Sequence, residues 1–289
     1  MRGWWRDLTD LVLPADCAGC GAPRTALCGR CRTALRRTVP GRVRPLPEPP
    51  GLPAVHAAAA YGGAVRELLL AHKERGALAL AGVLGAALAG SVRAGLGPGG
   101  PADGPAVRRG QATVLLVPVP SARWAVRARG HDPVRRMALA AAGELRRTGT
   151  PARVAAVLRQ RRAVADQAGL DARRRLVNLA GALEVTAGGA RLLAGGRVVL
   201  VDDLITTGAS LAEAARALRE VAVSHRDGAT AVYVAATREG REERRIGARP
   251  EKGQWVHGAP ENTARNAAGE TLRAAVIAAP PDSFEKTRN

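Results

Sequence analysis

The sequence predicts an α/β fold, a parallel β-sheet flanked by helices, with a small four-cysteine knuckle before it and a disordered tail after it. Two segments predict the sheet. Residues 112–117 form an apolar strand followed by a helix at 134–148, and residues 198–201 form a second apolar strand followed by a helix at 211–221. A third observation, four cysteines within residues 17–31, predicts the knuckle.

The chain divides into four expected parts. Its 289 residues suffice for one sizeable domain with attachments. The parts are the knuckle at 1–38, a proline-rich linker at 39–53, the α/β domain at 54–238 and an extension at 239–289. Further elements expected in the domain are strands at 55–61, 152–158 and 229–236 and a helical stretch at 64–93. Hydrophobic periodicity disappears after Arg238, so the extension is expected to be largely disordered.

The composition is strongly basic, with 44 Lys and Arg against 25 Asp and Glu and a net charge of +19. The nucleotide composition of the source genome is an alternative cause of the enrichment in Arg, Ala and Gly. The charge alone is therefore weak evidence for a nucleic-acid partner. Most of the excess precedes Arg238, which is consistent with a phosphate-rich ligand.

The amino terminus does not read as a signal peptide, because Asp7 and Asp10 interrupt its apolar residues. The apolar run at 77–90 is shorter than a membrane span and is interrupted by glycines. We therefore expect a soluble, cytoplasmic protein without membrane insertion.

The four cysteines are arranged as two Cys-x-x-Cys pairs, Cys17 with Cys20 and Cys28 with Cys31. Two such pairs supply four thiolates in tetrahedral geometry, which predicts a structural zinc site with no open coordination position. Two disulfides, a redox pair or an iron–sulfur cluster are the alternatives. Disulfides are disfavoured in a reducing compartment.

The most informative stretch is 198–210, which reads Val-Val-Leu-Val-Asp-Asp-Leu-Ile-Thr-Thr-Gly-Ala-Ser. It places two carboxylates, Asp202 and Asp203, at the end of a strand and a hydroxyl-rich loop before a helix. A helix N-terminus binds anions, so the candidate phosphate-binding residues are Thr206, Thr207, Gly208, Ala209 and Ser210. The alternative is a solvated connection with an N-cap. No Walker lysine follows Gly208, which disfavours a P-loop NTPase.

Two basic segments add further candidates. The first is expected as a loop after the strand at 112–117, where open α/β sheets bind ligands, and it contains Ser121, Arg123, Arg127 and Arg129. The second, 153–175, contains Arg159, Arg162 and Arg175 and is interpreted as a mobile lid that excludes water. A solvated helix face is the alternative for the second segment.

Two single residues also have alternative interpretations. Lys73 either belongs to a solvated helix end or faces the active site. Trp124 either packs in the core or the lid or stacks on a nucleic-acid base.

Together these motifs resemble the ComF family, also described as ComFC or GntX-like proteins, over residues 10–238. Residues 198–210 resemble the phosphoribosyl pyrophosphate (PRPP) motif of type I phosphoribosyltransferases. The other matching parts are Pro14–Gly21, Cys28–Cys31, Tyr61–Gly63, Lys73 with Gly76, Val117–Pro120, Arg127–Gly130, Gln167–Arg175, Asn178 and Gly181. His131-Asp132-Pro133 stands where the family commonly has Phe-Asn-Gln, so contacts made there cannot be carried over.

The resemblance implies a type I phosphoribosyltransferase-like domain that uses PRPP and Mg²⁺, with Asp202 and Asp203 as catalytic residues and residues 206–210 holding the 5′-phosphate. Ser121, Arg123, Arg127, Arg129, Arg159, Arg162 and Arg175 are the candidates for the pyrophosphate site and the lid. The resemblance also implies a role in natural transformation, with single-stranded DNA and competence proteins as partners. The alternatives are a non-catalytic DNA-binding accessory protein and a PRPP-sensing regulator. No motif identifies the acceptor substrate.

Overall fold

The computed structural model describes residues 16–35, 39–97, 112–162, 164, 171–235 and 272–285, with the backbone alone at 172 and 223–235. A six-stranded sheet has the order β1-β2-β8-β7-β3-β4, and β5 pairs with β6 in a small second sheet. The strands are β1 (Gly41–Val43), β2 (Ala54–Ala60), β3 (Val114–Pro118), β4 (Ala152–Val154), β5 (Leu158–Gln160), β6 (Leu183–Val185), β7 (Arg197–Leu204) and β8 (Arg273–Ala279).

The main sheet is parallel from β2 to β4, and only its edge strand β1 is antiparallel. The helices are α2 (Gly29–Ala34), α3 (Gly63–Glu74), α4 (Ala81–Leu96), α5 (Arg123–Arg129), α6 (Pro133–Arg147), α7 (Ala172–Leu179), α8 (Gly189–Leu193) and α9 (Ala209–Ala235). Short 3-10 turns occupy Leu78–Leu80 and Pro281–Ser283. The predicted α/β class, with helices flanking a mostly parallel sheet, is confirmed.

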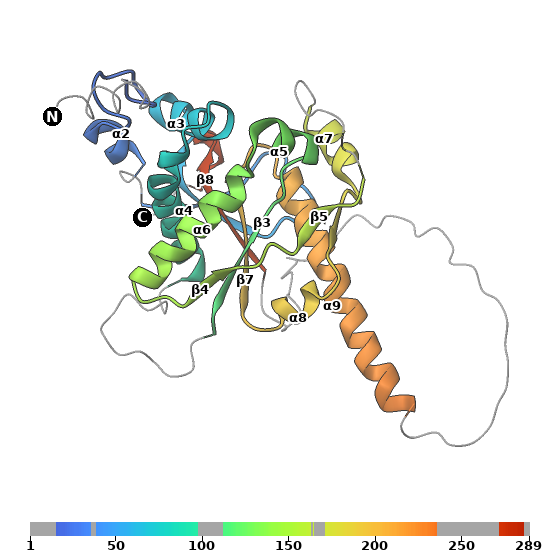
Figure 1. Cartoon of the computed structure of the whole chain (residues 1–289). Helices are drawn as coiled ribbons and strands as arrows, with labels where there is room; N and C mark the ends of the chain where they lie inside the picture. Colours follow the sequence, from blue (N-terminus) through green and yellow to red (C-terminus); the bar gives the residue numbers. More distant parts are fainter. Residues whose placement is uncertain are drawn as a thin grey trace.

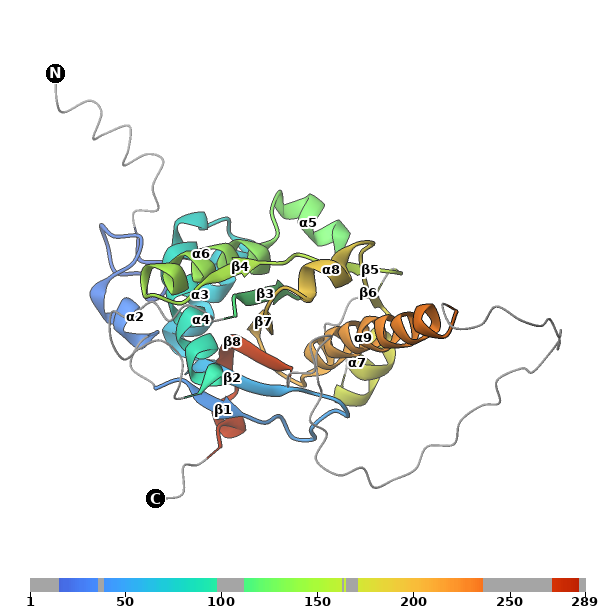
Figure 2. The same ribbon diagram turned by 90° about the horizontal axis from the view of Figure 1, so that it is seen from below.

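The helices cover both faces of the sheet (Figures 1 and 2), α4 and α6 on one face and α9 on the other. Side chains alternate along a strand, so successive residues of β7 point to opposite faces. Val199 and Val201 pack in the cluster that contains α4 and α6, whereas Val198 and Leu200 pack in the cluster that contains α9. This alternation decides where the carboxylates at the end of β7 point.

The apolar helical stretch predicted at 64–93 is divided into α3 and α4, with a turn between them. Leu78–Leu96 is long and apolar enough to cross a membrane, but it is 56% buried inside the protein. Gly85 lies so close to α6 that a Cβ there would come within 2.5 Å of the Ala140 Cβ. Among the described residues, this single candidate span is therefore a core helix of the α/β fold.

The last strand of the sheet was predicted at the wrong place. Residues 229–235 lie in α9 rather than in a strand at 229–236. The position beside β7 is occupied by β8, whose residues Ala274–Ala279 are completely or almost completely buried. A short apolar run has no period that separates strand from helix, and the Ala-rich residues 229–235 continue the preceding helix. The expectation of disorder over 239–289 is thus wrong for residues 272–285; the rest of that range lies outside the described residues.

Two further expectations need correction. Residues 41–43 of the expected linker form β1 and pair with β2, so this part of 39–53 belongs to the sheet. The basic segment after β3 was expected as a loop, but it forms α5, which ends at Gly130 in the left-handed conformation (φ +75°) that favours glycine.

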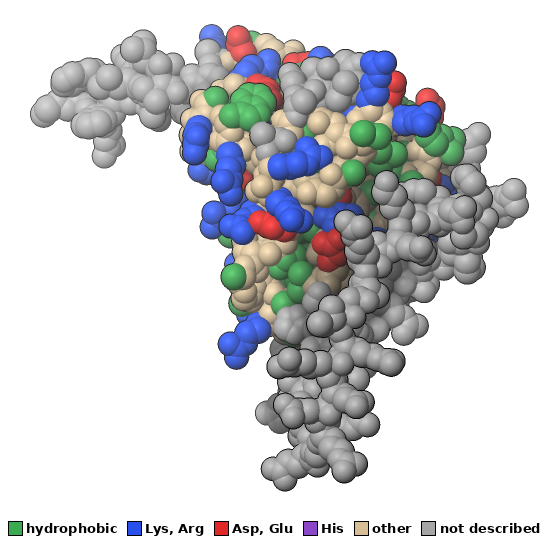
Figure 3. Space-filling view, turned by 90° about the vertical axis from the view of Figure 1, so that its right-hand side faces the viewer, with side chains coloured by type: hydrophobic (Ala, Val, Ile, Leu, Met, Phe, Trp, Pro, Cys, Tyr) green, Lys and Arg blue, Asp and Glu red, His purple; other side chains and the backbone are tan. Residues whose placement is uncertain are grey.

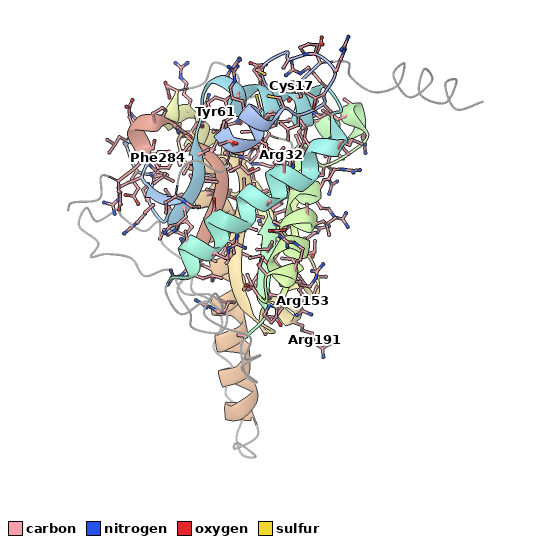
Figure 4. All side chains as sticks on the ribbon, turned by 90° about the vertical axis from the view of Figure 1, so that its left-hand side faces the viewer. Cys17, Arg32, Tyr61, Arg153, Arg191 and Phe284 are labelled. Carbon is pink, nitrogen blue, oxygen red and sulfur yellow. The ribbon has the colours of Figure 1, made fainter. Side chains whose placement is uncertain are left out.

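The cysteine knuckle packs against α3. Cys17 and Cys31 are buried, and both belong to the same hydrophobic cluster as Leu68 of α3. Gly19 fits closely here, because a Cβ at this position would lie 2.9 Å from the Cys31 Sγ and 3.2 Å from the Leu68 Cγ. Figure 4 shows Cys17 and Arg32 at one end of the molecule, opposite Arg153 and Arg191.

Candidate functional site

A cavity of about 370 Å³ opens at the carboxyl ends of β3 and β7. It is lined by Lys73, Val119, Pro120, Ser121, Ala122, Trp124, Ala125, Arg129, Val134, Gln160, Val164, Leu179, Leu183, Asp202, Asp203, Leu204, Thr206 and Ser210. Figure 1 shows α5 and α7 at this end of the sheet. Ligands of open α/β sheets bind at such an edge.

The two carboxylates of the motif continue opposite faces of β7. Asp203 continues the face of Val199 and Val201, and it is 7% exposed. Asp202 continues the other face, and its Oδ1 accepts a hydrogen bond from the backbone N–H of Asp203 at 2.8 Å. The cavity therefore has two adjacent carboxylates that point in different directions.

Lys73 is the partner of Asp203. Its Nζ donates to Asp203 Oδ2 at 2.9 Å, from the last turn of α3. The Asp203 carboxylate raises the pKa of Lys73, against the opposing effect of burial. The structure thus supports the interpretation in which Lys73 faces the cavity.

Asp202 differs from Asp203 in its electrostatic environment. Burial, and then the neighbouring Asp203 carboxylate, raise the pKa of Asp202 well above its ordinary value of 3.8. A carboxylate held in this way gains most from a cation or from hydrogen-bond donors brought by a ligand.

The loop after β7 leads directly into α9. Thr206, Thr207, Gly208, Ala209 and Ser210 surround a small hollow of about 30 Å³ at the start of this helix. Gly208 has φ +75°, and a Cβ there would lie 3.2 Å from Leu52 and from Pro49. Glycine is therefore required both by the backbone conformation and by the proline-rich segment packed behind the loop.

On the α5 side, Ser121 and Arg129 line the cavity. The Arg129 guanidinium donates to both carboxylate oxygens of Glu74, from Nε to Oε2 and from Nη2 to Oε1, each at 2.9 Å. Arg123 and Arg127 lie exposed on the same helix and are not among the residues that line the cavity.

The predicted lid arginines also differ in whether they reach the site. Arg175 of α7 donates to Thr206 Oγ1 at 3.2 Å and so touches the loop before α9. Arg159 pairs with Glu184 across the small β5–β6 sheet at 2.8 Å, and Arg162 donates to the carbonyls of Asn178 and Ala180. Residues 163 and 165–170 of the expected lid lie outside the described residues.

Two further residues at the site, Glu74 and Gln160, were not among the candidates predicted from the sequence. Glu74 directly follows Lys73, and its contact with Arg129 joins residues 55 positions apart. Gln160 lines the cavity from the end of β5. Neither belongs to a pattern that sequence spacing alone reveals. Trp124 lines the cavity and is 60% exposed, so packing in the core does not account for it.

The four cysteines form a compact group. The sulfur atoms of Cys17, Cys20, Cys28 and Cys31 all lie within 4.8 Å of one another. Tetrahedral zinc–thiolate bonds of about 2.3 Å place sulfur atoms about 3.8 Å apart. The group can therefore hold a metal such as zinc with small adjustments.

The environment of the sulfur atoms also suits a cation. Burial opposes ionisation of Cys17, but N–H groups of Cys28, Gly19 and Cys20 outweigh it, and its pKa falls to about 6. Burial and then the neighbouring sulfur atoms raise the pKa of Cys31. Four thiolates this close need a dication to balance their charge.

Asp202 and Asp203 supply oxygen ligands of the kind that Mg²⁺ prefers. Their cluster contains one lysine against two carboxylates, and burial and then the Asp203 carboxylate raise the pKa of Asp202. The residues present therefore fit Mg²⁺ brought by a phosphate ligand.

Fold and site together define an α/β protein with a cavity, lined by two carboxylates, at the carboxyl edge of its sheet. The family model of the phosphoribosyl transferase domain matches residues 155–255, a range that includes β7, the loop after it and α9. The match supports a phosphoribosyltransferase-like protein and PRPP as its substrate. A search of curated proteins found no match.

Proposed function

We propose that this chain is a PRPP-binding phosphoribosyltransferase of the ComF type. The observation that supports it most is the placement of Asp202 and Asp203 beside the hydroxyl-rich loop at the start of α9, from which Thr206 and Ser210 line the same cavity. In such a site the carboxylates bind the hydroxyls of a sugar, and the helix N-terminus binds its phosphate.

The proposed roles follow from these positions. Asp202 and Asp203 hold the ribose hydroxyls, directly or through Mg²⁺, and the hydrogen bond from Lys73 orients Asp203. The backbone and hydroxyl groups of residues 206–210 hold the 5′-phosphate. Mg²⁺, when bound, neutralises the pyrophosphate that leaves ribose C1.

The leaving pyrophosphate is assigned to the α5 side of the cavity, where Ser121 and Arg129 lie. Arg175 already reaches Thr206, so α7 is the element that we assign to closure over bound PRPP. Closure excludes water, which would otherwise attack the oxocarbenium-like ribose. Four other arginines remain candidates for the lid or the pyrophosphate site, and they would need to move toward the cavity: Arg123, Arg127, Arg159 and Arg162.

The acceptor side of the cavity is assigned to Trp124 and Gln160. An exposed indole and a primary amide suit a planar acceptor, which the ring stacks and the amide hydrogen-bonds. Leu179 and Leu183 supply apolar surface in the same cavity.

Pyrophosphate release tests the proposal. The protein is incubated with PRPP, Mg²⁺ and a panel of planar bases or single-stranded DNA, and pyrophosphate is measured. Release that depends on one acceptor supports the transferase, whereas PRPP binding without release favours a PRPP-sensing regulator. Asp202→Asn and Asp203→Asn should each abolish PRPP binding in calorimetry, and unchanged affinity would contradict the assignment.

We extend the proposal to the role of the protein in the cell. The resemblance to ComF proteins favours a cytoplasmic role in DNA uptake during natural transformation, with the residue 1–38 knuckle holding structural zinc beside the phosphoribosyltransferase-like domain. Competence proteins are then the expected partners.

A non-catalytic DNA-binding accessory protein is the second candidate, and exposed Trp124 in the basic helix α5 is the observation that favours it. Figure 3 shows Lys and Arg side chains spread over one face of the molecule, with Asp and Glu among them. Binding to single-stranded DNA should then weaken steeply with salt. A shallow slope would count against a multi-phosphate interface.

A further inference from the structure

Three consecutive residues at the last turn of α3 contact residues in or beside the cavity, and Lys73 is the one that lines it. The His72 carbonyl lies 3.3 Å from His131 Nε2, Lys73 donates to Asp203, and Glu74 accepts from Arg129. These three contacts connect the C-terminal end of α3 to β7 and to the end of α5. Of these, the contact of Glu74 has no role in the function proposed above.

We propose that Glu74 is a positioning residue, which orients the Arg129 guanidinium toward the pyrophosphate half of the cavity. This inference rests on the proposed function. A carboxylate that accepts from Nε and Nη2 fixes the plane of the guanidinium and leaves Nη1 and the second Nη2 hydrogen for an anion.

Stability alone does not explain the pair. Glu74 is 46% exposed and Arg129 is 18% exposed, and ion pairs at such a surface contribute little to folding. Arg129, however, is one of only two cationic side chains among the described residues that line the cavity, the other being Lys73. A fixed orientation at this place affects ligand binding more than folding.

The backbone beneath Arg129 is fixed as well. His131 lies with Nδ1 3.1 Å from the Arg129 carbonyl and Nε2 3.3 Å from the His72 carbonyl. The ring therefore joins the ends of α5 and α3 beside the Glu74–Arg129 pair. The remaining freedom of Arg129 is in its side chain, which is the part that Glu74 holds.

The Glu74 carboxylate has a second effect on anion binding, opposite in sign to orientation of Arg129. Its negative charge also reduces the attraction of Arg129 for anions. If neutralisation dominates, removal of the carboxylate tightens anion binding; if orientation dominates, removal weakens it. The sign of the change therefore decides between the two.

The test uses the whole protein, with inorganic pyrophosphate plus Mg²⁺ and ribose 5-phosphate as separate probes in calorimetry. Glu74→Gln should weaken pyrophosphate binding by about tenfold and leave ribose 5-phosphate binding unchanged. Glu74→Asp, which keeps the charge, should restore part of the affinity. Glu67→Gln is the matched control, because Glu67 pairs with Arg66 and Arg75 on the same helix and does not line the cavity.

Arg129→Gln should weaken pyrophosphate binding at least as much as Glu74→Gln, and the double variant should bind no worse than Arg129→Gln alone. Tighter pyrophosphate binding in Glu74→Gln, equal losses for both probes, or no effect of Arg129→Gln would overturn the inference while the proposed function stands. A wild-type protein that binds neither probe would overturn both.

Discussion

The cysteine knuckle and the cavity are built in opposite ways. All four sulfur atoms of the knuckle come from residues 17–31, so its geometry is local. The cavity takes side chains from α3, α5, β5, β7 and the start of α9, which are far apart in the chain. The knuckle brings together four sulfur atoms that could hold a cation, whereas the cavity combines carboxylates with hydroxyl and cationic donors. A local site survives damage to the sheet better than a distributed one does.

The largest expected effect comes from removing β8. Truncation after Thr271 deletes a buried strand between β2 and β7, so the sheet should lose its cooperative unfolding transition and the protein its PRPP binding. Circular dichroism and calorimetry measure these losses. Zinc retention by the truncated chain would sharpen the contrast with the local knuckle, and a truncated chain that unfolds and binds like wild type would break it.

Metal removal should have the next largest effect. Cys20→Ser leaves three thiolates and should lose bound zinc, with a loss of several kcal/mol of stability, about half or less of a typical zinc-binding energy. Cys20 is exposed, so the substitution itself removes little packing. Metal analysis and thermal unfolding measure the result, with Arg30→Ala as control. Full zinc content in Cys20→Ser would contradict a four-thiolate site.

Loss of the Lys73 charge should lower the stability less than loss of zinc does. Lys73→Met leaves the Asp203 carboxylate without its partner at a site where that side chain is 9% exposed. We expect a loss of about 1–2 kcal/mol together with weaker PRPP binding. Chemical denaturation measures the stability. Arg75→Met, which breaks a more exposed pair on the same helix, is the control and should cost less than about 1 kcal/mol.

The smallest expected effect has the opposite sign. Because the pKa of Asp202 is raised in the folded protein, the unfolded chain loses this proton first, and ionisation lowers stability as pH rises above the ordinary value of 3.8. Asp202→Asn should therefore raise the stability of the ligand-free protein by about 1 kcal/mol at neutral pH and by nothing near pH 3. Thermal unfolding at both pH values checks this. A gain that is equal at both would exclude the carboxylate as its cause.

The same contrast explains what the sequence could predict. The β7–α9 unit and the cysteine pairs are both local in the sequence. The sequence therefore predicted the strand and helix of the first and the close approach of the sulfur atoms in the second. Lys73 and Glu74 reach their partners only through the tertiary fold. The local pattern therefore left two interpretations for Lys73 and did not reveal Glu74. β8 escaped prediction because its apolar run is short and lies about 70 residues beyond β7.

The position of β8 also has a consequence for synthesis on the ribosome. Translation at 5–20 residues per second produces β8 roughly 4–14 s after β7. Over that interval the inner edges of β2 and β7 have no native neighbour, and exposed strand edges are templates for intermolecular pairing. Chaperone dependence and aggregation during translation are therefore the expected burdens of a sheet whose interior strand is made so late.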